Sequence, residues 1–372
     1  MRNSRRRATL FVVAAAMVSA CGNGGSTAPA TETEERTGTP PESEEPTPVD
    51  LEPIKVIVPG LSPVLAGTVA LGEAAGIFDD LGLSVDVQFG IGGSQNAISL
   101  VVAGEADLAE ISGIAAGALE VQGQDISIVW GVAGGGLGMS LITGADGAST
   151  VEELQASAAD GCSFAVTSPG SSSYGYAKTF SQALGIDCEL IEFGEVGQII
   201  GAVVSGRADA FAGPVAGPIN AAVQDGNLQV LFSTSDPDDN TIEISRFTER
   251  TFAGMAENLE AKRASVEAFV TGMRQAAEAY ASMSNEEIAN LLLTLEEYQV
   301  DYPEEADFER LQADVEQARA FVNWDDGHIS EENWSSQLEA ATTWEVPDFD
   351  ADDPARSYDA VVDMSFYDAS TE

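Results

Sequence analysis

The chain has 372 residues, enough for about two domains of ordinary size. It carries 61 acidic and 16 basic residues, which gives a formal net charge of −45, and 44% of its residues are hydrophobic. A hydrophobic content this high excludes a disordered acidic polymer. An acidic surface repels phosphate backbones, so we expect no nucleic acid partner. The excess of acids over lysines favours a surface that stays soluble in high salt.

The first 20 residues have the pattern of an export signal. Arginines dominate the first seven residues, and an apolar run follows from Ala8 to Ala20. The run is shorter than the roughly 20 apolar residues that a spanning helix needs, so it is typical of a secretory signal peptide. Its end, Val18-Ser19-Ala20-Cys21, resembles the lipobox of bacterial lipoproteins. That resemblance implies lipidation of Cys21; the alternative is a plain signal with an incidental cysteine.

Residues 21–51 are rich in Thr, Pro, Glu, Gly and Ser and have no apolar periodicity. This composition predicts a disordered tether between a lipid anchor and a folded body. No later segment is apolar enough to predict a membrane span. We therefore expect an exported protein held at the outer face of the cell membrane by its lipid alone.

The segment from residue 52 alternates short apolar runs with helical periodicity, which predicts an α/β fold with crossover helices. Strands are expected at 54–59, 83–89, 107–111, 126–133, 139–142, 163–167, 190–193, 208–212 and in a last run to 232. Helices are expected at 64–78, 92–102, after the serines near 173 to 184, at 196–204, and, in a mostly helical region from about 243, at 257–283, 285–297, 307–322 and 330–344.

Two stretches repeat one pattern, a helix end followed by Gly-x-Ala-Asp and a strand. They are Val102–Ala109 and Val204–Phe211. The pattern predicts a glycine that ends each helix and structural aspartates, Asp107 and Asp209, at the turns. The repeat predicts two similar lobes with a cleft between them. We divide the chain into lobe one (52–142, with a return over 233–345), lobe two (143–232) and an acidic tail (346–372).

Cys162 and Cys188 each begin a predicted strand, with a helix between the two strands. Strand–helix–strand units make parallel neighbouring strands, so the two cysteines should lie close enough for a disulfide. Two buried free thiols are the alternative. Metal binding is not expected, because the chain has one histidine and no paired cysteine motif.

The stretch Leu71–Val87, LGEAAGIFDDLGLSVDV, resembles the first helix and second strand of the nitrate/sulfonate/taurine and thiamine-precursor substrate-binding family. Gly90–Ser94 and the two Gly-x-Ala-Asp stretches resemble the same family, over about 54–232 and more loosely to 283. The resemblance implies a two-lobe periplasmic-binding-protein-like fold of type II, with a ligand cleft between the lobes and a helical C-terminal region. It also implies delivery of a small solute to the permease and ATPase of an ABC importer; we expect a monomer.

Ligands of open α/β sheets bind beyond the carboxyl ends of the strands, and this rule selects the candidate residues. They are Ser62, Ser112, Gly170, Ser171, Ser172, Ser173, Tyr174, Glu195 and Pro214. The serine run opens a helix, where free backbone N–H groups favour an anion or a carbonyl; ordinary N-capping is the alternative. Tyr174 is a candidate for stacking on a flat ligand and Glu195 for receiving a cationic amine.

Between residues 51 and 232 the cations are Lys55, Lys178 and Arg207, and none is predicted at the cleft. The sequence therefore predicts no arginine clamp for a sulfonate or nitrate. A sulfonate or taurine-like solute and a pyrimidine or other heteroaromatic both stay open. Residues 52–232 contain no histidine for a Ser-His-Asp set, so we expect no catalysis and no cofactor. A ligand sensor for a membrane receptor and an exported enzyme are the alternative functions.

Overall fold

The structure, a computed structural model, describes residues 51–90, 93–134, 139–159, 161–234, 248–305, 307–322 and 327–371. The predicted signal peptide, the lipidation site Cys21 and nearly all of the predicted tether lie outside the described residues. None of the helices in the described part of the chain has the length and apolar character needed to cross a membrane.

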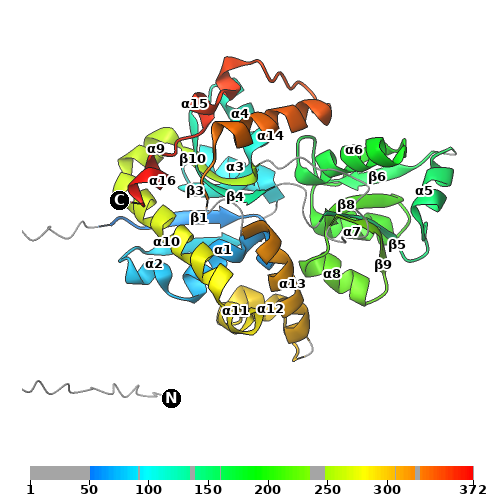
Figure 1. Ribbon diagram of the computed structural model, residues 1–372, viewed down its shortest axis with the longest axis horizontal. Coiled ribbons are helices and arrows are strands. Elements are labelled where there is room, and N and C mark those ends of the chain that lie inside the picture. The colour runs from blue at the N-terminus through cyan, green and yellow to red at the C-terminus, as the bar shows by residue number, and fades with distance from the viewer. Residues whose placement is uncertain are drawn as a thin grey trace, which may run out of the picture. The chain divides into compact units, whose positions relative to one another are not determined.

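The described strands form two five-stranded sheets, of order β2-β1-β3-β10-β4 and β7-β6-β8-β5-β9. We call the parts of the chain built on them lobe one and lobe two (Figure 1). The strands are β1 (Ile54–Val58), β2 (Val85–Phe89), β3 (Leu108–Ser112), β4 (Ile126–Gly134), β5 (Met139–Gly144), β6 (Ser163–Val166), β7 (Glu189–Glu192), β8 (Ala210–Pro214), β9 (Leu228–Ser233) and β10 (Thr248–Met255).

Helices follow most strands as the α/β prediction requires. They are α1 (Pro63–Ala74), α2 (Ile77–Asp80), α3 (Gly93–Val102), α4 (Gly113–Val121), α5 (Val151–Ala158), α6 (Ser172–Leu184), α7 (Val196–Val204), α8 (Gly217–Gln224), α9 (Ala256–Ala261), α10 (Arg263–Ser282), α11 (Asn285–Leu292), α12 (Glu296–Asp301), α13 (Asp307–Val322), α14 (Glu331–Thr343), the 3-10 helix η2 (Pro354–Arg356), α15 (Tyr358–Val361) and α16 (Ser365–Ala369). Side chains fix several helix starts: Ser284 and Ser330 each form a capping box, and Thr150 accepts from the backbone N–H of Glu153 at 3.2 Å.

The first sheet contains a strand that the sequence analysis missed. The chain from about 243 was predicted to be mostly helical, but β10 pairs antiparallel with both β3 and β4. Its central residues Thr251, Phe252 and Ala253 are each at most 1% exposed, so both faces of the strand are buried. The β-branched and aromatic residues of this segment and its pairing with two strands together make it a strand.

The second sheet begins earlier than predicted. β5 pairs with β8 and β9 in the second sheet. Met139–Ile142 therefore belongs to lobe two, whereas the predicted boundary at residue 142 placed it in lobe one. Successive residues of β5 point to opposite faces of the sheet: Leu141 packs in a core with residues of α6, and Ile142 in another core with residues of α7. The two helices therefore cover opposite faces of the sheet, as Figure 1 shows.

The segment 346–372, predicted as a weakly patterned acidic tail, is folded. Val361, Phe366 and Tyr367 are buried in the core of lobe one. Just before this segment, Trp344 at the end of α14 is buried in lobe two, and its indole N–H donates to the Thr179 hydroxyl at 3.0 Å. The chain thus reaches lobe two again after α13 and then returns to lobe one.

The two repeated turns have the same geometry in both lobes, and they confirm the structural role predicted for the aspartates. The carboxylate of Asp107 accepts from the backbone N–H of Lys55 at 2.8 Å, and that of Asp209 from Ser163 at 2.8 Å. The preceding glycines, Gly104 and Gly206, have φ of 70° and 68°, in the left-handed region that glycine adopts without strain.

Cys162 and Cys188 form the predicted disulfide, with their Cα atoms 4.7 Å apart. The residues that follow them, Ser163 and Glu189, are paired in the parallel β6–β7 ladder. The strand register therefore brings the two cysteines together, as the strand–helix–strand pattern predicted.

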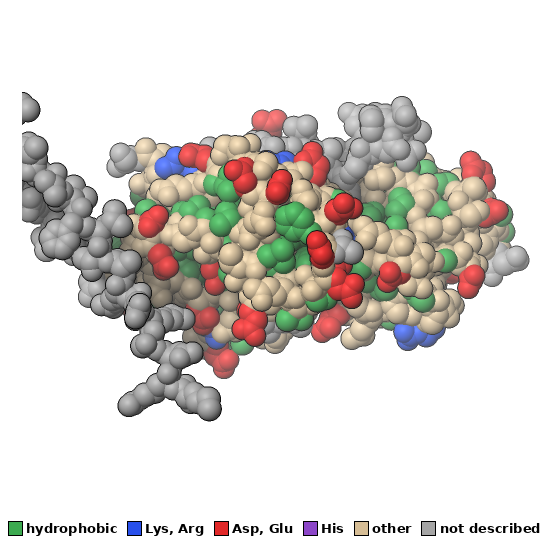
Figure 2. Space-filling view, turned by 90° about the horizontal axis from the view of Figure 1, so that it is seen from below, with side chains coloured by type: hydrophobic (Ala, Val, Ile, Leu, Met, Phe, Trp, Pro, Cys, Tyr) green, Lys and Arg blue, Asp and Glu red, His purple; other side chains and the backbone are tan. Residues whose placement is uncertain are grey.

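Figure 2 shows acidic side chains spread over one face of the molecule, with few basic ones among them. One acid of α1, Glu73, is partly buried, and its Oε2 has no hydrogen-bond partner. Burial, and then the nearby Glu297, Asp86 and Asp79, raise the pKa of Glu73 to about 7. Its carboxyl thus favours the protonated form in the folded protein more than in the unfolded chain.

This raised pKa makes stability depend on pH. The wild-type protein has extra stability below pH 4.5 and loses it as the pH rises through about 7. We expect Glu73→Gln to have little effect near pH 4 and to stabilise the protein by about 1 kcal/mol at pH 8, less than the full pKa shift implies because water screens a half-exposed carboxyl. Thermal unfolding of both proteins at pH 4, 6 and 8 measures the difference. The exposed Glu105→Gln is the control, and an equal effect of Glu73→Gln at all three pH values contradicts the prediction.

Candidate functional site

A cavity of about 980 Å³ lies between the two lobes, and we call it the interlobe cleft. Its walls follow the carboxyl ends of strands from both sheets. Lobe one contributes Pro59–Ser62 after β1 and Ser112 at the end of β3. Lobe two contributes Thr167–Ser173 after β6 and Pro214 at the end of β8. This is the position in which open α/β sheets bind ligands.

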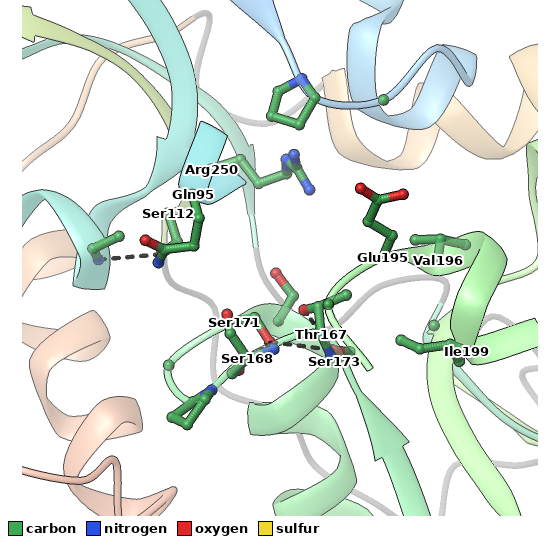
Figure 3. Close-up of a pocket in the computed structure, with 18 of the residues that line it drawn as sticks. Gln95, Ser112, Thr167, Ser168, Ser171, Ser173, Glu195, Val196, Ile199 and Arg250 are labelled. Carbon is green, nitrogen blue, oxygen red and sulfur yellow. Dashed lines mark hydrogen bonds between the residues drawn. The ribbon is translucent and has the colours of Figure 1, made fainter. Parts of the chain in front are cut away.

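One wall of the cleft is the serine loop, residues Ser168–Ser173, which leads from β6 into α6 (Figure 3). Ser171 caps the helix: its Oγ accepts from the backbone N–H of Tyr174 at 3.3 Å and donates to the Ser168 carbonyl at 2.6 Å. The backbone N–H of Thr167 donates to the Ser173 Oγ at 2.9 Å. The hydroxyl of Ser172, by contrast, makes no hydrogen bond to any described residue. Two serines thus hold the loop, and the third, Ser172, lines the cavity with a hydroxyl that has no partner among the described residues.

These separate roles predict separate effects of two alanine substitutions. Ser171→Ala removes a helix cap and should lower the free energy of unfolding by about 1 kcal/mol. Ser172→Ala removes a hydroxyl without a partner among the described residues and should change stability by less than about 0.5 kcal/mol. Urea unfolding of the two variants measures both values. Equal destabilisation by the two substitutions contradicts the assignment.

The wall opposite the serine loop comes from lobe one. Figure 3 shows Ser112, Gln95 and Arg250 across the cavity from the serine loop. Ser112 caps α4 by accepting from the backbone N–H of Ala115 at 3.2 Å. Arg250, on β10, pairs through its Nε with Glu110, a carboxylate that is fully buried. The ion pair fixes the guanidinium at the cleft, because a buried carboxylate holds its cationic partner strongly.

Acidic side chains also line the cleft. Glu195 is the N-cap residue of α7, and its side chain caps no backbone group. It is exposed, and Figure 3 shows it on the same side of the view as Val196 and Ile199, facing the region of Arg250. Glu297 and Asp301 of α12 line the cavity from lobe one. The cleft therefore presents groups of both charges.

The structure brings most of the predicted site residues to this cavity. The residues that line it are Ser62, Ser112, Gly170, Ser171, Ser172, Ser173, Glu195 and Pro214. Ser62 is only 5% exposed, and its hydroxyl has no partner among the described residues. Tyr174 is a correction: it does not line the cavity, because its ring is buried in the core of lobe two and its hydroxyl donates to the Glu345 carbonyl at 3.4 Å.

The prediction that no arginine reaches the cleft is also wrong. Arg250 and Arg356 both line it, and both lie after residue 232, beyond the segment searched for cations. Arg250 lies in the stretch TERTFAGM, whose β-branched and aromatic residues were a signal for a strand. Nothing in the pattern around Arg356 indicates a place in the cleft, since the contact depends on the return of the chain to lobe one.

Among the described residues, no group of three or more His, Cys, Asp or Glu is placed to hold a metal ion. The cavity lining given by the described residues includes neither histidine nor cysteine. What the site offers is hydroxyl groups, helix N-termini, two guanidinium groups and carboxylates, which suit binding of a polar organic molecule.

Comparison with known proteins identifies the fold. A protein of Bordetella bronchiseptica RB50 superposes with a TM-score of 0.67 at 20% identity, over 87% of this chain and 98% of that one. The ligand-binding component of an ABC-type import system from Staphylococcus aureus, solved with zinc bound, gives 0.63 at 13% identity, over 85% and 98%. The nitrate-binding protein NrtA of Synechocystis PCC 6803 gives 0.62 at 13% identity, over 87% and 89%.

No protein-family model matches the sequence, and no curated protein matches it. The structural likeness covers nearly the whole described chain. The protein therefore has the periplasmic-binding-protein fold, as the sequence resemblance implied: two α/β lobes with a cleft between them and a helical C-terminal region.

Proposed function

We propose that the protein captures a small organic solute in the interlobe cleft and delivers it to the permease and ATPase of an ABC importer. The observation that carries this proposal is the cavity of about 980 Å³ that both lobes line at the carboxyl ends of their strands. Its volume suits a solute with one or a few rings or a short chain. Hydroxyl groups without partners among the described residues, those of Ser62 and Ser172, supply hydrogen bonds that a solute would complete.

The sequence resemblance and the shared fold support the transport role. The Staphylococcus aureus protein that superposes on this chain is the ligand-binding component of an ABC-type import system, and the Synechocystis protein binds nitrate. By analogy, we propose membership of the nitrate/sulfonate/taurine and thiamine-precursor substrate-binding family. We further propose export by the signal peptide and attachment through a lipid on Cys21, with the folded body acting as a monomer outside the cell membrane.

The charges in the cleft favour a solute with polar groups of its own. Arg250 stands where an acidic or carbonyl group of the solute would lie, and Glu195 where an amine would lie. A taurine-like zwitterion and an aminopyrimidine both fit this arrangement. We propose binding without chemistry, by analogy with the ligand-binding component from Staphylococcus aureus that shares the fold.

A thermal-shift screen of the purified chain tests the proposal. The panel contains taurine, alkanesulfonates, nitrate, aminopyrimidines, riboflavin and aromatic dicarboxylates, each in low and in high salt. A solute at 100 times its Kd stabilises the protein by about 2.7 kcal/mol, which raises Tm by several degrees. A hit that also makes the protein more compact in small-angle X-ray scattering supports capture by lobe closure. Failure of the whole panel, in a sample shown to be folded, contradicts these solute classes.

A further inference from the structure

Arg356 occupies one corner of the interlobe cleft. It ends η2 in the folded C-terminal segment, and only 5% of it is exposed. Its guanidinium lies 4.4 Å from the centre of the Phe349 ring and against Gly117 of α4, where an added Cβ would be 3.4 Å from Nη1. The side chain lines the same cavity as the serine loop.

This guanidinium has no counterpart of opposite charge in contact with it. Its Nε and Nη1 are buried without hydrogen-bond partners, and the described residues form no ion pair with it. Burial lowers the pKa of Arg356, and the more distant charges of Asp353 and Asp350 only oppose that shift. Most of the cost of burying the charge is therefore not offset within the described protein.

Arg310 is a buried arginine of the same chain whose guanidinium has hydrogen-bond partners. It is 8% exposed and stacks on Tyr302 at 4.2 Å, much as Arg356 stacks on Phe349. Yet Arg310 donates to the Asp307 carboxylate at 2.8 Å and to the Asp301 carbonyl at 3.0 Å. Both arginines thus stack on an aromatic ring, but only Arg310 also has a carboxylate partner.

We propose that Arg356 receives an oxyanion group of the solute, a carboxylate, sulfonate or phosphate, in this corner of the cleft. The inference rests on the proposed function, because it names the class of solute. The planar fork of a guanidinium binds two oxygens of such a group at once. Phe349 packs on the guanidinium, and further apolar residues of α4 and the C-terminal segment line the same cavity: Ile114, Ala115, Ala118, Leu119 and Val346. A solute that joins its acidic group to an apolar part would fit this lining.

Titration calorimetry with inorganic sulfate, at an ionic strength held constant with chloride, tests this assignment. We compare the wild type with Arg356→Met, which keeps the length of the side chain and removes its charge. The control is Arg263→Met, since Arg263 also stacks on a phenylalanine, Phe366 at 4.3 Å, and does not line the cleft. We expect saturable sulfate binding by the wild type and by Arg263→Met. For Arg356→Met we expect affinity at least about tenfold weaker.

The possible results separate this inference from the proposed function. Equal sulfate binding by Arg356→Met and the wild type, or no saturable binding by the wild type, overturns the assignment. If the solute screen then still gives a hit, the proposed function stands without it. If Arg356→Met loses sulfate binding and the solute screen fails, the result supports an oxyanion site at Arg356 and contradicts the proposed solutes. Arg356→Lys covers the case in which the methionine variant does not fold: it keeps the charge but not the fork and should also weaken sulfate binding.

Discussion

Replacing Asp314 with alanine lowers the free energy of unfolding by about 3 kcal/mol. Asp314 lies on α13 in lobe one, and its carboxylate is fully buried. It accepts from the Tyr302 hydroxyl at 2.7 Å, the Asn220 side-chain amide at 2.7 Å and the backbone N–H of Gly217 at 3.1 Å. The substitution leaves these three donors buried without an acceptor, and that loss accounts for the expected effect.

Asn220 and Gly217 belong to α8 in lobe two, so the same carboxylate ties the lobes together. We therefore expect Asp314→Ala to broaden the distribution of lobe positions as well. Urea unfolding measures the stability change, and small-angle scattering of the solute-free protein measures the spread. The control is Glu309→Ala on the same helix, because Glu309 is exposed and its replacement should cost less than about 0.5 kcal/mol. Similar losses for the two variants would refute the role given to Asp314.

Removing the disulfide has an effect of similar size. The Cys162–Cys188 bond spans 26 residues of sequence, and closing a loop of this length stabilises a protein by about 3.5 kcal/mol through the entropy of the unfolded chain. We expect the double variant Cys162→Ser, Cys188→Ser to unfold several degrees lower than the wild type. Calorimetry of the variant, and of the wild type with and without reductant, measures the difference.

Reductant provides the matched control for this prediction. It should lower the Tm of the wild type to near that of the double variant and should leave the variant unchanged. A double variant that is as stable as the oxidised wild type would contradict a stabilising disulfide. Because the bond joins the starts of β6 and β7, far from the serine loop at their other ends, solute affinity should change little.

The alternation of strands and helices predicted an α/β fold, and the repeated Gly-x-Ala-Asp pattern predicted two lobes. The family resemblance implied the periplasmic-binding-protein fold. The disulfide, the turns at Asp107 and Asp209 and the serine loop lie where strands and helices alternate regularly, and the structure places them as predicted. Their geometry follows from the fixed order of strands and helices, which the sequence pattern carries.

The errors share one physical cause, the distant return of the chain. β10 is a strand because two strands far away in sequence flank it, and its local pattern does not require this. Arg250 on β10, and Arg356 in the C-terminal segment, enter the cleft by the same route. Tyr174 is buried by Trp344 and its neighbours near the end of α14, which no local pattern predicts.

We propose that a solute binds between the serine loop and the wall formed by lobe one. The most direct test is titration calorimetry of the best solute from the screen with the variant Ser172→Trp. This substitution places a bulky ring at the lining of the cleft and removes a hydroxyl that has no partner among the described residues. The control is Ser205→Trp, exposed at the far end of α7 and outside the lining. We predict that Ser172→Trp abolishes binding while Ser205→Trp binds like the wild type. Unchanged affinity of a folded Ser172→Trp would show that the solute binds elsewhere.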